Sequence, residues 1–133
     1  MEPQLLHYQI TDKIIKAFYT IYNTLGYGFL EKVYENALSL ELRKLGLVVE
    51  GQAPIKAHYQ GILVGEYFAN LLVEGLVIIE LKAAEGIAEE HEAQLLNYLK
   101  ATEIEVGFLL NFGPKPQFQR KIFTNDQKTR RIG

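Results

Sequence analysis

The stretch Val77–Gly86, VIIELKAAEG, places an acid and a base in an otherwise apolar run. Glu80 and Lys82 are two residues apart, so on a β-strand their side chains point to the same face. The other residues of the run are so apolar that both faces of the strand are expected to be covered. Burying a charged pair is costly unless the charges are paired, hydrogen-bonded or bound to an ion. This stretch therefore predicts a buried strand that carries polar chemistry.

The runs on either side of this strand predict an α/β (α+β) fold with a mixed sheet of four to five strands flanked by helices. Two strand-like runs precede it, and the short connections Gln60-Gly61 and Glu74-Gly75 favour antiparallel neighbours. A helix and a fully apolar run follow it, and a strand–helix–strand crossover implies parallel pairing. The expected order is ααβββαβ(β). The predicted helices are about 11–25, 30–46 and 88–103, and the predicted strands are 47–59, 62–73, 76–84, 105–113 and, at the edge, 117–125.

Length and composition exclude several classes of protein. The chain has 133 residues, which predicts a single domain over 1–133, with an edge strand and basic tail at about 114–133. With 48% hydrophobic and 23% charged residues, the composition is globular rather than disordered. The absence of cysteine excludes disulfides, thiolate zinc sites and cysteine nucleophiles. No signal peptide or membrane-length apolar run is evident, so a soluble cytoplasmic protein is expected.

The net charge of -2 provides no global positive field for nucleic acid. A local basic strip near the C-terminus would be sufficient for binding. The alternative is that these residues belong to a solvated, frayed C-terminus. The candidate residues are Arg120, Lys121, Lys128, Arg130 and Arg131.

Asn70 interrupts a run that otherwise predicts a central strand, where asparagine is disfavoured. Its position relative to Glu80 depends on the turn around Gly75. A three-residue loop 73–75 would pair Leu72 with Leu76 and would place Asn70 on the face of Glu80, diagonal to it. A two-residue turn would place Asn70 on the opposite face. A bulge or a cross-strand hydrogen bond would also explain this asparagine.

Three further polar residues lie on predicted helices. Glu31 begins the second helix, where an acid also complements the helix dipole. Gln94 and Tyr98, four residues apart, share one face of the third helix. Each has an ordinary explanation, since Tyr98 fits a helix–sheet boundary and Gln94 a helix surface.

Carboxylates near a strand end, with a lysine two residues on, suit the hydrolysis of a phosphodiester. Mg²⁺ prefers hard oxygen ligands, usually one or two carboxylates, and keeps several waters. The metal polarises the phosphate and lowers the pKa of an attacking water. A lysine orients that water and offsets the developing negative charge. A cation would also compensate Glu80, although the same spacing fits a structural salt-bridge network.

The segment GFLEKVY, Gly28 to Tyr34, carries the signature of the GxxExxY proteins, with Gly28, Glu31 and Tyr34 in place. The resemblance continues through YFANLLVEGLVIIELKA and HEAQLLNYLKATEIEVGFLLNFG, and it extends from about Ile10 to Gly113. The GxxExxY proteins are assigned to the PD-(D/E)xK nuclease superfamily. The resemblance therefore implies a restriction-endonuclease-like fold.

The resemblance also implies roles for individual residues. Glu31 would correspond to the helical acid that contacts the metal directly or through water. Glu80 and Lys82 would be the acid and lysine of the E-x-K half-motif. Gln94 and Tyr98 resemble the Q-x-x-x-Y element of the exonuclease-like branch, which is expected to help position substrate. The implied cofactor is Mg²⁺ or Mn²⁺. The implied partner is nucleic acid, with DNA expected, and the protein could form a homodimer.

The family aspartate falls on Asn70, which offers one neutral oxygen where aspartate offers a carboxylate. The implied metal ligands are therefore Glu80, Asn70 and Glu31, with Mg²⁺ binding weakened. Two functions remain open. One is a metal-dependent deoxyribonuclease whose activity is weakened or lost through Asn70. The other is an inactive module of the same fold that binds nucleic acid or a partner protein, and a purely structural polar cluster is a third interpretation.

Overall fold

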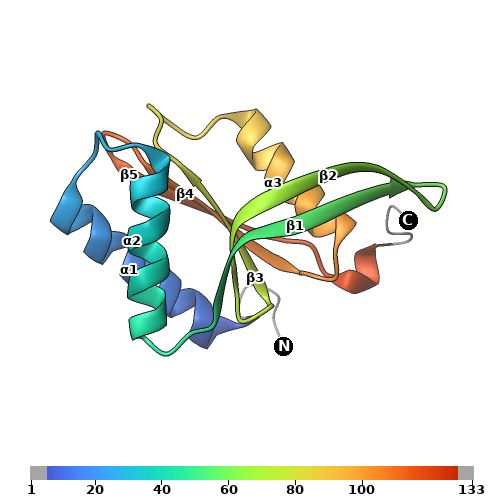
Figure 1. Cartoon of the computed structure of the whole chain (residues 1–133), viewed down its shortest axis with the longest axis horizontal. Helices are drawn as coiled ribbons and strands as arrows, with labels where there is room; N and C mark the ends of the chain where they lie inside the picture. The colour runs from blue at the N-terminus through green and yellow to red at the C-terminus, as the bar shows by residue number, and fades with distance from the viewer. Residues whose placement is uncertain (1–5, 129–133) are drawn as a thin grey trace.

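The computed structural model describes residues 6–128, and its elements follow the predicted order (Figure 1). A 3₁₀ turn, Asn125–Gln127, follows the last strand. The elements are α1 (Tyr8–Leu25), α2 (Glu31–Lys44), β1 (Val49–Tyr59), β2 (Ile62–Val73), β3 (Val77–Lys82), α3 (Glu89–Ala101), β4 (Val106–Phe112) and β5 (Pro116–Ile122).

The strands form a five-stranded mixed sheet in the order β1-β2-β3-β4-β5. β3 and β4 are parallel, as the crossover through α3 requires, and the other neighbours are antiparallel. The predicted fold class is confirmed, and the predicted last strand is present at the sheet edge as β5.

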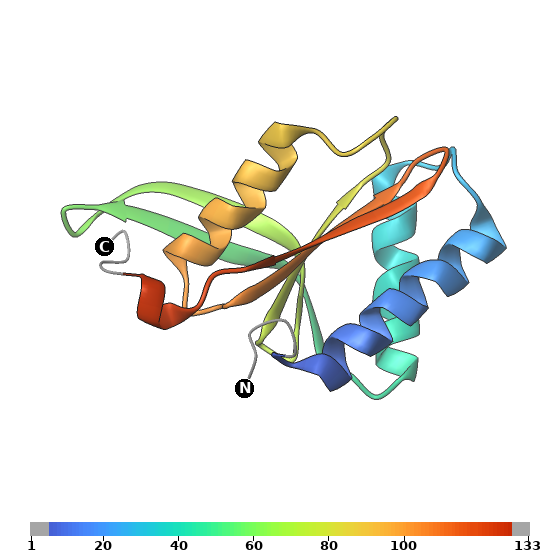
Figure 2. The same cartoon turned by 180° about the vertical axis from the view of Figure 1, so that it is seen from behind.

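Helices cover both faces of the sheet. α1 and α2 pack on one face, where Phe18 and Leu38 join Ile79 of β3 in a buried cluster. α3 packs on the other face (Figure 2). There Leu95 joins Ile78 of β3 in a second cluster. β3 is therefore buried from both sides, as its apolar run predicts.

The signature segment forms the connection between α1 and α2. Gly28 has a φ of 112°, a conformation that favours glycine. The Tyr34 hydroxyl donates to the Gly26 carbonyl over 2.7 Å and accepts from the Phe29 N–H over 3.2 Å. The Tyr34 ring is fully buried and stacks on Phe112 at 4.3 Å between centroids. Gly28 and Tyr34 thus fix the start of α2, the helix that begins with Glu31.

β1 and β2 extend beyond the rest of the sheet as a two-stranded hairpin, here called the arm (residues 53–69) (Figure 1). Its tip is a two-residue turn, in which Gln60 and Gly61 both have positive φ values of 51° and 79°. β2 pairs with β3 only over Leu71–Val73, so the arm has no third strand beside it.

The turn between β2 and β3 differs from the predicted loop. Val73 pairs with Val77, and the Leu76 N–H donates to the Val73 carbonyl over 2.9 Å, which makes a three-residue loop of 74–76. Leu72 pairs with Ile78, so the predicted pairing of Leu72 with Leu76 was wrong by two residues. With Leu72 paired to Ile78, Asn70 lies directly opposite Glu80 instead of diagonal to it.

Candidate functional site

The polar site lies where β2 separates from β3. The backbone N–H of Asn70 donates to the Glu80 carboxylate (Oε2) over 2.8 Å. In return, the backbone N–H of Leu81 donates to the Asn70 side-chain oxygen over 2.9 Å. Ala69 packs in the α3-side cluster and Leu71 in the α1/α2-side cluster, so the alternation of faces breaks at Asn70. Side chains here replace the backbone bonds of the ladder.

Glu35 of α2 is the main site residue that the sequence interpretation missed. Its carboxylate is buried, with 7% of the side chain exposed, and it accepts from Asn70 Nδ2 over 2.7 Å. Gln52 Nε2 donates to both of its oxygens over 3.2 Å, and Lys32 Nζ forms an ion pair over 2.9 Å. Burial alone would raise the pKa of Glu35, but the bonds from Lys32, Asn70 and Gln52 outweigh it and lower the pKa.

One signal pointed to Glu35, because it lies one helical turn after Glu31 and so shares its side of α2. Gln52 carried no such signal. It lies opposite Asn70 on β1, between the pairs Gly51–Leu71 and Ala53–Ala69, with a positive φ of 51°. A glutamine in this conformation cannot be inferred from a strand-like pattern.

Glu80 is the buried acid at the centre, with 6% of its surface exposed. Burial raises its pKa to about 7. The Asn70 N–H and the charge of Lys82 work in the opposite direction, whereas the charges of Glu31 and Glu35 add to the rise. Glu80 therefore keeps its proton to a higher pH than an exposed glutamate does, and four neighbouring groups modulate the shift that burial causes.

Glu31 and Lys82 are more exposed than the buried acids Glu35 and Glu80. Glu31 is the first residue of α2 and is exposed, while Lys82 is the last residue of β3 and is half-buried. The influence of both charges on the pKa of Glu80 places them in its electrostatic environment. Direct hydrogen bonds thus join Asn70 to Glu80 and Glu35, whereas Glu31 and Lys82 act on Glu80 through their charges.

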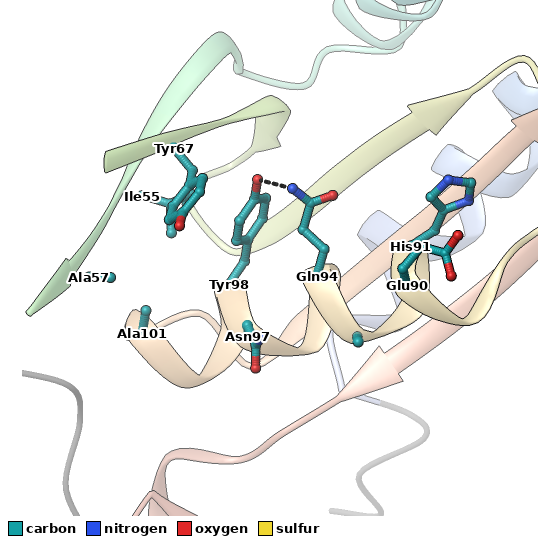
Figure 3. Close-up of a pocket in the computed structure, with 10 residues that line it drawn as sticks. Ile55, Ala57, Tyr67, Glu90, His91, Gln94, Asn97, Tyr98 and Ala101 are labelled. Carbon is teal, nitrogen blue, oxygen red and sulfur yellow. Dashed lines mark hydrogen bonds between the residues drawn. The ribbon is translucent and has the colours of Figure 1, made fainter. Parts of the chain in front are cut away.

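Gln94 and Tyr98 lie together on α3, as their spacing predicts. Gln94 Nε2 donates to the Tyr98 hydroxyl over 3.0 Å (Figure 3). Tyr98 has 5% of its surface exposed, and burial, with a contribution from the charge of Glu80, raises its pKa to about 12. The charge of Glu80 on β3 therefore acts on a side chain of α3.

The predicted basic strip does not form one surface within the described residues. Arg120 lies over the Phe108 ring at 5.2 Å on the α1 side, whereas Lys121 pairs with Glu92 of α3 over 2.7 Å. These neighbours on β5 therefore point to opposite faces of the sheet. Lys128 Nζ donates to the carbonyls of Thr102 and Ile104, beyond the end of α3. The other two members, Arg130 and Arg131, lie outside the described residues.

The donor atoms do not fit a preformed site for a hard divalent cation. The Asn70 oxygen already accepts from Leu81, and its NH₂ group, which cannot bind a cation, points at Glu35. Glu35 is surrounded by three donors, and one Glu80 oxygen is occupied by the Asn70 N–H. In residues 6–128, no group of three or more acidic or histidine side chains is arranged to hold a metal ion.

A family model for the PD-(D/E)XK nuclease superfamily matches residues 8–122. The chain belongs to this superfamily. The match covers both helices of the α1/α2 face, the polar site and all five strands. It confirms the restriction-endonuclease-like fold, while membership of the narrower GxxExxY family stays a prediction.

The fold is also similar to a solved structure titled "Crystal structure of SSO0001". The TM-score is 0.53 at 17% sequence identity, over 74% of this chain and 53% of the other, so this chain spans about half the length of that one. No curated protein matches the sequence. Within residues 6–128, no helix combines the length and apolar character needed to cross a membrane.

Proposed function

We propose that this protein binds nucleic acid, DNA in the first place, through a nuclease-type site in which Asn70 suppresses hydrolysis. The superfamily supports nucleic acid as the partner. The observation that carries suppression is the hydrogen bond from Asn70 Nδ2 to Glu35 Oε1, at 2.7 Å. An amide donor stands where the implied aspartate would present a second charged oxygen.

The charge balance of the site supports this proposal. Glu35 is paired with Lys32 and accepts hydrogen bonds from two amide groups, and burial raises the pKa of Glu80, so neither acid requires a further cation as compensation. An aspartate at position 70 would add a third carboxylate to those of Glu35 and Glu80. A divalent cation would then be the natural counter-charge for the three acids. Lys82 is only partly buried, and a lysine at such a position suits a phosphate group.

The test compares the wild type with Asn70→Asp for cleavage of labelled single- and double-stranded DNA in Mn²⁺ and in Mg²⁺. We expect no significant cleavage by the wild type and at least tenfold more by Asn70→Asp, dependent on the divalent ion. In the Asn70→Asp background, Glu80→Gln and Lys82→Ala should each abolish the gained cleavage. Binding of the same DNA by the wild type, measured by fluorescence anisotropy in EDTA, should remain.

Asn70→Ser is the matched control, because it removes the amide without adding a carboxylate. It should stay inactive while the thermal melting of all variants is monitored by circular dichroism. Robust cleavage by the wild type that Lys82→Ala abolishes would contradict suppression by Asn70. The absence of DNA binding by the folded wild type would contradict the proposal as a whole.

A second candidate is a hydrolase that is active with Asn70 in place. The exposed carboxylate of Glu31 favours it, because its charge acts on Glu80 and it has no bond to a donor within the described residues. This candidate predicts divalent-dependent cleavage by the wild type that Glu31→Gln removes. The assay above therefore separates the two functions directly.

A further inference from the structure

A cavity of about 630 Å³ lies between the arm and α3 (Figure 3). The arm contributes Ile55, Ala57 and Tyr67, and α3 contributes a row that includes Gln94 and Tyr98. Its volume is in the range of pockets that hold small organic groups. Because the arm leaves the sheet at Asn70, this cavity begins beside the polar site.

The lining of the cavity suits a flat, uncharged group. The two aromatic rings, Tyr67 and Tyr98, lie 5.9 Å apart and are tilted by 38°. Ile55 and Ala57 add apolar surface beside the two rings, and Glu90 and His91 line the cavity from α3. Among residues 6–128, no lysine or arginine lines the cavity, and the Glu90 carboxylate disfavours a phosphate group there. Tyr67 remains 49% exposed, which leaves ring surface for a ligand to stack on.

Polar groups for recognition are also present at this position. Gln94 donates to the Tyr98 hydroxyl, which leaves the hydroxyl proton and the Gln94 carbonyl oxygen without another hydrogen bond in residues 6–128. A donor and an acceptor side by side match the edge of a nucleobase. Ala69, the residue before Asn70, packs in the same buried cluster as Ile55 and Tyr98 of the cavity, so the cavity and the acid site are neighbours.

We propose that this cavity receives one unpaired nucleobase of a strand whose phosphate lies at Lys82 and Glu80. This inference rests on the proposed function, and it specifies single-stranded nucleic acid as the class of ligand that the site binds. A base within a duplex is stacked and paired, so it would have to leave the helix to enter the cavity. Stacking on Tyr67, with Gln94 and Tyr98 at the base edge, therefore favours single strands over duplexes.

The arm offers a matched pair of variants. Tyr67 faces the cavity, whereas the next residue, Phe68, pairs with Pro54, is similarly exposed at 53% and does not line the cavity. Tyr67→Ala should weaken binding of a labelled oligothymidine about tenfold, the loss typical of one stacked base. Tyr67→Phe should retain binding, and Phe68→Ala should change it less than twofold.

The ligands in this anisotropy experiment are oligothymidine, an oligonucleotide of equal length with abasic sites, and a blunt duplex. We expect the wild type to bind oligothymidine at least tenfold more tightly than either other ligand. Equal affinity for all three, with no effect of Tyr67→Ala, would overturn the base pocket while leaving the proposed function intact. No binding to any of them would overturn the proposed function, and the pocket proposal with it.

Discussion

The two halves of β2 have similar apolar composition but very different surroundings. The half in the body of the sheet, Leu71–Val73, lies between β1 and β3, and Leu71 is 1% exposed. The half in the arm has only β1 beside it, and Leu63 is 49% exposed. Burial along this strand is therefore decided by the neighbouring elements rather than by the residues themselves.

Asn70 lies at the junction of these halves, and the difference explains why a polar site forms there. Where a strand loses a neighbour, backbone N–H groups lose their ladder partners and need other acceptors. Asn70 and Glu80 supply them with their side chains. The same departure of the arm opens the cavity against α3, so the acid site and the cavity have one structural origin.

The largest expected effect comes from removing the same side chain in each half. Leu71→Ala deletes a buried side chain and should lower the free energy of unfolding by about 3–4 kcal/mol. Leu63→Ala, on the arm, should change it by less than about 0.5 kcal/mol. Urea denaturation followed by circular dichroism measures both, and equal losses would show that the arm is packed as tightly as the body.

A smaller effect concerns pH and the buried acid at the junction. Because the pKa of Glu80 rises from 4.5 to about 7 on folding, the folded state holds a proton that the unfolded state releases over this range. Stability should therefore fall as the pH rises from about 4.5 to 7, by about 2–3 kcal/mol, and should level off above. Glu80→Gln, which keeps an acceptor for Asn70, should remove most of this slope in urea titrations at several pH values.

Glu35 provides the contrasting pH behaviour within the same site. Because the pKa of Glu35 is lower in the folded state than its ordinary value of 4.5, the ionised side chain stabilises the fold at pH values above about 4.5. This contribution is lost as the pH falls below about 4.5. The two acids therefore act in separate pH windows. A wild-type stability that is flat between pH 4.5 and 7 would contradict the burial of an ionisable Glu80.

Much of the fold follows from the sequence because periodicity and short turns are local signals. The eight helices and strands are present in the predicted order, and the apolar run around Glu80 correctly indicated burial on both faces. The pairing of Leu72 with Ile78 was missed, since the loop includes Leu76, an apolar residue that reads as part of the strand.

The site was less predictable because its bonds join distant segments. Glu80 and Lys82 were recognisable as charges in an apolar strand, but Glu35 gave the impression of an ordinary helix residue until Asn70 and Gln52 were placed beside it. Likewise, Arg120 contacts Phe108 on one face of the sheet and Lys121 pairs with Glu92 on the other. Which partner each side chain finds depends on the helix that packs against that side of β5. Residue type alone does not carry that information.

The smallest expected effect tests the coupling of Lys82 to the junction. Lys82 lowers the pKa of Glu80, against the larger effect of burial. Lys82→Met keeps the apolar stem and removes the charge, so the pKa of Glu80 should rise slightly, as expected when a partly exposed and therefore screened charge is removed. Carbon-detected NMR titration of the Glu80 carboxyl measures this shift, with Lys16→Met, a change in the exposed pair on α1, as the control. If the pKa of Glu80 is unchanged in Lys82→Met, the charge of Lys82 does not act on Glu80, although the two residues lie on the same strand.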